Sequence, residues 1–283
     1  MNYGIVGVGK VGKTVAIKLH SLGLLGWAVD RSGRLGGSAI PTYKSISEIK
    51  APADCVIIAT PDGVIGDVAA ELSRITALPK YACHLSGATT VEVLSPLSLA
   101  NVKTFAIHPM QTFGIERDDI FDNIFWGVES SEDGYEIACE LIAHLGGNPF
   151  KLSREVLANK AAYHLIGVAA ANFMQGIIEF SRQLANFSGL EPSKLLPAIL
   201  KTAFDNSLRS IYANTEVPIT GPVARADIAT IAKHIDSLKS EKDLQDLYLL
   251  ETNFLANVLL RSNAISVAQY EAIVKVIADS EAL

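Results

Sequence analysis

The fold is decided by a stretch near the N-terminus, Tyr3-Gly4-Ile5-Val6-Gly7-Val8-Gly9-Lys10-Val11-Gly12. A β-rich run leads there into a hexapeptide with the spacing GxGxxG, and a helical pattern over Val11–Ser21 follows. The spacing alone arises often by chance, but a strand before it and a helix after it form the context in which it binds a dinucleotide. The stretch therefore predicts the first unit of a Rossmann-type domain, with a plain glycine turn as the alternative.

Each glycine of the motif has a physical reason to be there. Gly7 permits a tight turn, Gly9 lets backbone N–H groups approach a pyrophosphate, and Gly12 lets the helix pack closely on the strand. Lys10 and Val11 open the helix, whose positive end attracts phosphates. We expect these five residues to hold the pyrophosphate of a dinucleotide cofactor.

Beyond the motif, the chain divides into a strand-rich part and a helical part. Up to about Pro149, β-rich runs alternate with helical patterns, which is typical of helices packed on a parallel sheet. The expected strands lie near 3–8, 26–30, 54–59, 81–86, 103–108 and 124–129. The expected helices are Val11–Ser21, Gly63–Ile75, Asp133–Leu145, Glu155–Phe187, Pro192–Tyr212, Ala224–Lys239, Leu244–Leu260 and Ser266–Ala282. We predict an α/β fold class: a doubly wound Rossmann domain over 1–152, then an all-helical domain over 153–283 for substrate binding and dimerisation.

The end of the second strand bears on which cofactor is bound. Asp30 stands about 20 residues after the motif, where a carboxylate would accept hydrogen bonds from the ribose 2′-OH of NAD. Arg31, Ser32 and Arg34 follow, and two cations with a hydroxyl suit a 2′-phosphate. The balance favours NADP, with NAD as the alternative and a solvated turn as the structural explanation.

The third strand leads into a loop that would border the same ligand. Thr60 and Pro61 are expected beside the ribose and pyrophosphate of the cofactor. Asp62 is placed either to contact the ligand or to cap the helix from Gly63.

Two histidines near strand ends are candidates for chemistry. Ser86, with Gly87, suits contact with nicotinamide or a substrate oxygen, and His84 on the same strand face would stand beneath Ser86. His108 is the better proton donor, because imidazole titrates near neutrality and strand ends reach the ligand. Both histidines have a structural, hydrogen-bonded alternative.

The helical half supplies further candidates. Lys160 and His164 are four residues apart, and Asn172 lies about 80° around the helix from His164, which permits a shared cleft. A Lys or His here could protonate a carbonyl oxygen as hydride arrives at carbon, although an exposed Lys beside a core-edge His is the ordinary meaning. Arg225 and Asp227 are expected in the first turn of a helix, where Arg225 either binds a carboxylate or phosphate or pairs with an acid.

Composition narrows the class of protein. Lys+Arg total 24 against 30 Asp+Glu, for a formal charge of −6, and no basic run suggests nucleic acid as a partner. Three cysteines without CxxC spacing predict buried thiols in a reducing cytosol and no metal site. The N-terminus has no signal-peptide pattern, and the richest apolar stretch, Leu165–Ala171, is short, so we expect a soluble, cytoplasmic protein.

Several of these motifs together resemble a known family. They are the glycine motif, His84-Leu85-Ser86-Gly87, His108-Pro109-Met110-Gln111-Thr112-Phe113, Tyr163-His164 with Asn172, and Gly221-Pro222-Val223-Ala224-Arg225-Ala226-Asp227. Over nearly its whole length the chain resembles Rossmann-like NADP-dependent oxidoreductases with a helical C-terminal domain of unknown function, within the 6-phosphogluconate dehydrogenase-like superfamily. That family usually has a glycine where this chain has Ala226, which argues against a role there that needs positive φ.

The resemblance and the residues lead to one hypothesis with two rivals. The first is an oxidoreductase that moves hydride between NAD(P)H and a small polar substrate with a C=O or C=N group. Nicotinamide C4 would lie near Ser86-Gly87, His108 and the Lys160/His164 pair would supply protons, and Arg225 would hold an acidic group. The tripeptide His108-Pro109-Met110 makes a prephenate-type dehydrogenase an alternative. A non-catalytic NADP-binding sensor or scaffold is the other.

The helical domain also offers apolar surface for association. Its apolar residues Phe173, Ile177, Ile178 and Phe180 favour a homodimer interface, with an internal core as the alternative.

Overall fold

The computed structural model describes residues 1–36, 38–114 and 119–281, which form two compact units. The first unit is Met1–Met174 and the second is Gln175–Leu283. The predicted change from strands to helices occurs within the first unit, after its last strand ends at Lys151. The domain limits of 1–152 and 153–283 stay a prediction beside this division.

The first unit contains an eight-stranded sheet in the order β3-β2-β1-β4-β5-β6-β7-β8. Its strands are β1 (Tyr3–Val6), β2 (Leu25–Val29), β3 (Thr42–Tyr43), β4 (Cys55–Ile58), β5 (Tyr81–His84), β6 (Lys103–Pro109), β7 (Phe125–Ser130) and β8 (Asn148–Lys151). All neighbouring pairs are parallel except β6 and β7. The carboxyl ends of β1, β2, β4 and β5 therefore meet at one edge of the sheet.

The sequence did not predict β3 and β8, the two edge strands. β3 has two residues, too few for a periodic pattern. β8 follows directly after two glycines and contains Pro149, and these residue types are typical of turns. Proline is tolerated in an edge strand because one of its sides has no partner strand to bond.

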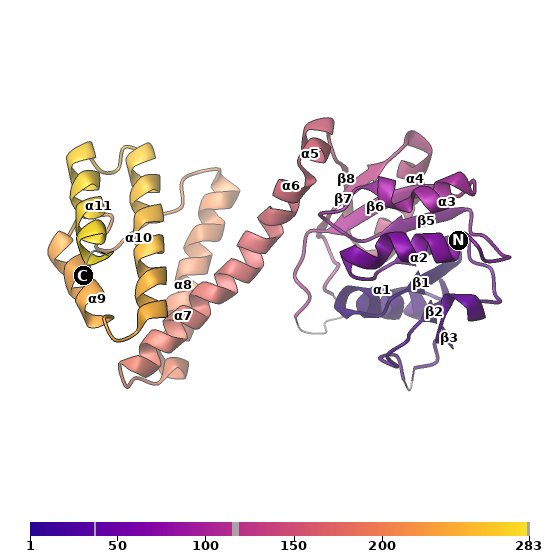
Figure 1. Cartoon of the computed structure of the whole chain (residues 1–283), viewed down its shortest axis with the longest axis horizontal. Coiled ribbons are helices and arrows are strands. Elements are labelled where there is room, and N and C mark those ends of the chain that lie inside the picture. The colour runs from indigo at the N-terminus through magenta and orange to yellow at the C-terminus, as the bar shows by residue number, and fades with distance from the viewer. Residues whose placement is uncertain (37, 115–118, 282–283) are drawn as a thin grey trace. The chain divides into compact units, whose positions relative to one another are not determined.

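Helices cover both faces of this sheet, as a doubly wound fold requires. They are α1 (Lys10–Ser21), α2 (Ile65–Leu72), α3 (Ser95–Leu99) and α4 (Glu132–Leu145). Figure 1 shows these four helices around the sheet. One core packs α1 and α4 on side chains such as Ile5, Ile57 and Ile107, and the other packs α2 and α3 on alternate residues such as Val56 and Ile58. The α/β class is confirmed.

The predicted helix Glu155–Phe187 is divided in the structure. Its parts are α5 (Arg154–Ala158), α6 (Lys160–Gly167), a π-helical turn at Val168–Phe173, and α7 (Met174–Phe187). The break lies at Asn159, whose backbone is not helical (φ −137°, ψ 56°) and whose side chain accepts a hydrogen bond from the Ala162 N–H. Asparagine is a preferred N-cap, so α6 starts anew at Lys160.

The helical run Lys160–Phe187 is much longer than Leu165–Ala171, the apolar stretch on which the sequence prediction was based. Its 28 residues include an 18-residue window of mean hydropathy 1.3, of which 6% is buried, and this suffices by length and composition to cross a membrane. One such helix is by itself weak evidence of a membrane span.

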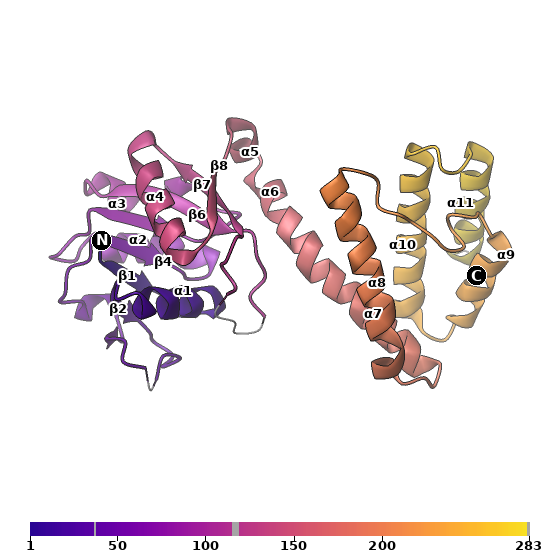
Figure 2. The same cartoon turned by 180° about the vertical axis from the view of Figure 1, so that it is seen from behind.

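The second unit is all-helical. After α7 it contains α8 (Pro192–Ala213), α9 (Ile228–Ser237), α10 (Lys242–Arg261) and α11 (Val267–Glu281) (Figure 2). Its core gathers buried residues of the last three helices, including Ile231, Leu259 and Ile273. The predicted start of a helix at Ala224 is wrong, since α9 starts at Ile228, and Ala282 lies outside the described residues.

Candidate cofactor and catalytic site

The glycine motif forms a tight strand-to-helix turn between β1 and α1. Gly7 has φ +97°, and a Cβ there would stand 2.8 Å from the backbone of Ala59. A Cβ on Gly12 would stand 2.2 Å from the Gly7 carbonyl oxygen, so the helix approaches the strand as only glycine allows. In front of Gly9 the nearest atom to a built Cβ is 4.0 Å away, on Arg34. Neighbouring atoms therefore leave no room for a side chain at Gly7 or Gly12, whereas there is space beside Gly9, which directly precedes α1.

A cavity of about 580 Å³ lies at the carboxyl ends of β1, β2 and β4. Its lining includes predicted cofactor residues: Gly7, Gly9, Asp30, Arg31, Ser32, Thr60 and Pro61. A second cavity of about 450 Å³ shares Gly9 and Arg34 with the first and adds Lys10 and Lys13. These volumes fall within the range of small-molecule sites. Thr60 Oγ1 is buried without a hydrogen-bond partner in the described parts of the chain.

The Asp30 carboxylate is used inside its own loop. It is 2% exposed; one oxygen accepts a hydrogen bond from the Leu35 N–H at 2.8 Å, and the other accepts from the Ser32 N–H and Oγ at 3.2 Å. Burial raises the pKa of Asp30, but these bonds outweigh it and hold the pKa below its usual value. To bind a ribose diol, as the NAD alternative requires, Asp30 would have to give up these bonds.

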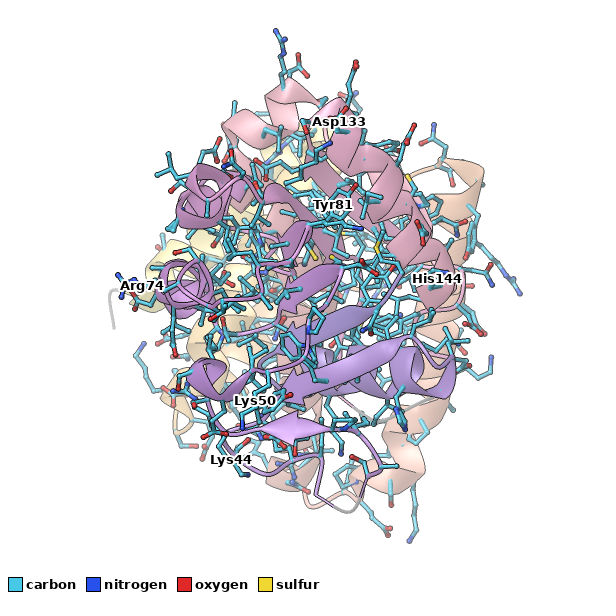
Figure 3. All side chains as sticks on the ribbon, turned by 90° about the vertical axis from the view of Figure 1, so that its right-hand side faces the viewer. Lys44, Lys50, Arg74, Tyr81, Asp133 and His144 are labelled. Atoms are coloured by element: carbon cyan, nitrogen blue, oxygen red, sulfur yellow. The ribbon has the colours of Figure 1, made fainter. Side chains whose placement is uncertain are left out.

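Cations surround this loop. Arg31 and Ser32 are exposed and line the larger cavity, while the Arg34 guanidinium donates to the Val8 carbonyl at 3.3 Å. Lys44, at the β3 edge of the sheet (Figure 3), donates from Nζ to the Asp30 carbonyl at 3.3 Å. The sequence did not single out Lys44, because β3 is too short to give a strand signal.

Asp62 does not cap the helix that follows it. A 3₁₀ turn at Asp62–Val64 precedes α2, and neither start has a side-chain cap hydrogen bond. The predicted capping role is wrong, because the chain enters α2 through this turn and the helix begins only at Ile65.

His84 and Ser86 together shape the turn after β5. His84 is fully buried; its Nδ1 accepts from the Ser86 N–H at 3.1 Å, and its Nε2 faces the Thr90 carbonyl at 3.2 Å. Ser86 Oγ accepts from the backbone N–H of Ala88 and Thr89 at 3.2 and 3.0 Å. Burial, then Lys160, lowers the pKa of His84 to about 4, so the imidazole is neutral at pH 7. His84 therefore takes the hydrogen-bonded structural role.

His108 lies near the end of β6 against Tyr163 of α6. Its Nδ1 is 3.1 Å from the Tyr163 hydroxyl, and its ring centroid is 5.7 Å from that of His164. Burial first, then His164 and Lys160, lower the pKa of His108 to about 4. This differs from the expectation of an imidazole that titrates near neutrality, because a lowered pKa keeps His108 neutral at pH 7.

Lys160 is buried in an ion pair. It is 4% exposed, its Nζ lies 2.6 Å from Oε2 of Glu129, and it also donates to the Thr89 carbonyl. The alternative of an exposed lysine is wrong. Glu129, 6% exposed on β7, was missed, although a glutamate after the apolar run Phe125–Val128 was an available signal. Lys160, His164, His108, Ser86 and Glu129 thus all belong to the first unit.

The last two predicted substrate residues lie in different units, Asn172 in the first and Arg225 in the second. Asn172 is exposed on the π-helical turn. Arg225 is exposed in the second unit and precedes α9, so its predicted place in a first helical turn is wrong. Asp227 is the N-cap, accepting from the Thr230 N–H at 3.1 Å and Oγ1 at 2.7 Å.

Ala226 adopts positive φ, at +50°, in the position where the resembling family has glycine. The expectation that alanine excludes this conformation is wrong. The backbone of an L-residue is strained there, and the surrounding loop holds it in place. Among the described residues there is no group of three His, Cys, Asp or Glu that could bind a metal ion.

The two parts of the chain match two family models. Residues 1–109 match the Rossmann-like domain, and residues 124–253 match the domain of unknown function DUF2520. No curated protein matches the sequence.

Several solved structures share the fold. A provisionally assigned NADP oxidoreductase from Bacteroides fragilis is 20% identical, with TM-score 0.72 over 89% of this chain and 96% of that chain. A protein from Thermotoga maritima is 23% identical, with TM-score 0.67 over 92% and 99%. A reductive aminase from Aspergillus terreus, in complex with NADPH and ethyl levulinate, is 15% identical, with TM-score 0.61 over 96% and 98%.

Proposed function

We propose that this chain, which combines a Rossmann-like domain with a DUF2520 domain, is an NADP-dependent oxidoreductase. It would transfer a hydride between nicotinamide and a small polar substrate with a C=O or C=N group. The similar structures include enzymes of this kind, such as the reductive aminase that binds NADPH.

The choice of NADP rests on the Asp30 carboxylate, which is hydrogen-bonded within its own loop. Its carboxylate oxygens accept hydrogen bonds from Leu35 and Ser32, which removes the usual ligand of an unmodified ribose. Arg31 and Ser32 are exposed on the cavity wall, where a cation and a hydroxyl suit a dianionic 2′-phosphate.

The cofactor would be held by the glycine motif and by the loop after β4. Gly7, Gly9, Lys10, Val11 and Gly12 would hold the pyrophosphate, and Thr60 and Pro61 would border the ribose. When bound, the nicotinamide supplies or accepts the hydride.

The remaining predicted side chains would hold the substrate. His108 would donate a hydrogen bond, while His164 beside it, Asn172 and Arg225 stay predicted contacts. Lys160 and Ser86 support the site rather than react, because Glu129 and the turn 86–90 already occupy their polar atoms.

The test is turnover by the purified chain. NADPH oxidation would be followed at 25 °C with a panel of keto acids, aldehydes, cyclic imines and ketone–amine mixtures, with prephenate and NADP as a separate reaction. Oxidation that needs a carbonyl or imine supports the proposal. Prephenate oxidation alone would make it a prephenate-type dehydrogenase, and binding without any turnover would make it a sensor or scaffold.

We also propose that two copies associate through α7 and α8. All of α8 lies within the described residues, and none of its residues is buried. Exposed apolar side chains gather on these helices, namely Ile177, Phe187, Leu195, Ile199, Leu208, Ile211 and Tyr212. A helix normally owes its stability to a packed apolar face, which a second copy would supply. Light scattering should give twice the chain mass of 30.2 kDa, whereas 30.2 kDa, or recovery only with detergent or vesicles, would contradict it.

The compartment is part of the same proposal. Cys55, Cys83 and Cys139 are free thiols, as a reducing cytoplasm allows. Recovery of the native protein in the soluble cytoplasmic fraction is expected, and recovery in the membrane fraction would contradict it.

A further inference from the structure

We infer that Tyr163 is a positioning residue that holds His108 in one neutral tautomer, with the proton on Nε2. His108 then presents a fixed hydrogen-bond donor to a substrate atom that carries a lone pair. The tautomer follows from the contacts of this chain alone, whereas the identity of the acceptor rests on the proposed function.

The hydrogen bonds of the Tyr163 hydroxyl decide the tautomer. Tyr163 is 7% exposed, and its hydroxyl oxygen lies 3.1 Å from Nδ1 of His108. Burial raises the pKa of Tyr163 to about 12, so the hydroxyl keeps its proton. Within the described residues that proton has no other acceptor than Nδ1, and a buried O–H without a partner is costly. Nδ1 therefore accepts, and the ring proton is on Nε2.

The backbone is shaped to allow this contact. Strands β6 and β7 pair antiparallel with His108 opposite Gly127. A Cβ on Gly127 would stand 2.3 Å from the Tyr163 hydroxyl oxygen, so any other residue there would displace the tyrosine. Glycine at this point of β7 is required for Tyr163 to reach the imidazole.

The imidazole is fixed on its other side by Gly87. A Cβ on Gly87 would stand 2.6 Å from both Cε1 and Nε2 of His108. The Tyr163 ring meets the His108 ring edge to face, with centroids 5.5 Å apart and planes at 77°. These distances place Nε2 of His108 beside the turn that follows β5.

The start of α6 is anchored independently of this pair. Lys160 and Tyr163 are the two buried residues of α6, three positions apart on one side of the helix. Lys160 binds Glu129 of β7 and the Thr89 carbonyl, which ties the helix to the sheet and to the turn 86–90. The buried ion pair thus sets the position of Tyr163 one turn further on.

A fixed neutral donor limits the substrate. A carbonyl oxygen or a neutral imine nitrogen has a lone pair to accept the Nε2–H bond, whereas a protonated iminium nitrogen has none. In carbonyl reduction, hydride and its electron pair go to carbon, the C=O π pair moves to oxygen, and a proton from water completes the alcohol. His108 would stabilise the charge that develops on oxygen without transferring its own proton.

The test reads the tautomer directly. Full-length protein labelled with ¹⁵N-histidine would be studied by long-range ¹H–¹⁵N correlation at pH 7.5, with the His108 signals assigned through His108→Gln. We expect a protonated Nε2 and a lone-pair Nδ1 in the native chain, and a mixture of tautomers in Tyr163→Phe. The matched control Tyr135→Phe, on α4, should leave the His108 signals unchanged. A proton on Nδ1 in the native chain, or no change in Tyr163→Phe, would overturn the inference.

Cofactor binding and turnover are measured on the same samples, which separates the two proposals. Failure to bind NADPH with the expected tautomer intact refutes the proposed function and leaves the inference standing. Where turnover is found, Tyr163→Phe should lower kcat about ten- to hundred-fold with a smaller change in KM. Unchanged kcat would contradict the role of His108 as donor.

Discussion

The two halves of the sheet's carboxyl edge differ in how their polar groups are used. The half at β1, β2 and β4 contains the cavity, with the exposed cation Arg31 on its wall and glycines in place of side chains. The half at β5, β6 and β7 is filled by its own side chains, among them His84, Lys160 and Glu129. The first half thus exposes a cation on a cavity wall, whereas in the second half His84, Lys160 and Glu129 already have hydrogen-bond partners.

The largest loss of stability is expected when one partner of the buried ion pair between Lys160 and Glu129 is removed. Lys160→Met leaves Glu129 buried without a counter-charge, and we expect a loss of about 3–5 kcal/mol in the free energy of unfolding. Urea denaturation monitored by circular dichroism measures it. Adding Glu129→Leu should recover most of the loss.

The control is a surface pair between α4 and β6. Lys103 and Asp133 are 54% and 71% exposed at the side chain, and Lys103→Met should have a far smaller effect. Equal losses for Lys160→Met and Lys103→Met would mean that the second half is not the tightly coupled network described.

Acid should lower the free energy of unfolding through His84 and His108, in the half of the edge at β5 and β6. His84 and His108 have pKa values of about 4 in the folded chain against an ordinary 6.5. Between pH 6.5 and 4 the unfolded chain binds protons at these rings that the folded chain does not, so unfolding becomes easier as the pH falls. We expect a loss of a few kcal/mol, on the order of 3 for each ring, over this window, and no contribution from these rings above about pH 7.

The variant His108→Gln isolates one ring. Urea denaturation at pH 7.5, 6, 5 and 4.5 should show a shallower decline for the variant than for the native chain. Parallel declines would contradict the neutral state of His108 in the folded chain.

Adding one methyl group at Gly87 tests how tightly His108 is held. Its Cβ would stand 2.6 Å from the imidazole, so Gly87→Ala should cost about 1–3 kcal/mol and displace the ring. Gly63→Ala is the matched control, because a built Cβ there meets no atom within 4 Å. Thermal unfolding of both variants gives the comparison, and similar melting temperatures would show that the turn accommodates the methyl group.

The smallest expected effect lies in the second unit. Ala226→Gly relieves an L-residue at φ +50° and should raise the free energy of unfolding by about 0.5–1 kcal/mol. A lower stability in the variant would mean that Ala226 contributes packing that outweighs the strain.

The parts of the molecule that the sequence predicted are those with local causes. The turn at Gly7 and Gly12 was predicted because a close backbone approach needs glycine wherever the rest of the chain lies. Strand β8 was missed because Pro149 and the two glycines before the strand are typical of turns, and only pairing with β7 makes Asn148–Lys151 a strand.

The partners across the site needed the structure. Glu129 meets Lys160 although they are 31 positions apart, and Tyr163 meets His108 across 55, and no periodic pattern encodes such pairings. Asp30 was placed correctly at a strand end, but its carboxylate accepts a hydrogen bond from the Leu35 N–H only because the loop folds back. Long-range hydrogen bonds, rather than residue types, decided which groups are available to a ligand.

The most direct test of the account is calorimetric titration of cofactor-stripped protein with NADPH and with NADH. The chain should bind NADPH more tightly. Arg31→Ala should weaken NADPH about tenfold while leaving NADH unchanged, whereas Lys50→Ala, outside the cavity, should change neither. Tighter binding of NADH, or the same loss for both cofactors in Arg31→Ala, would contradict the assignment of this loop to a 2′-phosphate, and no binding of either at millimolar concentration would contradict the cofactor itself.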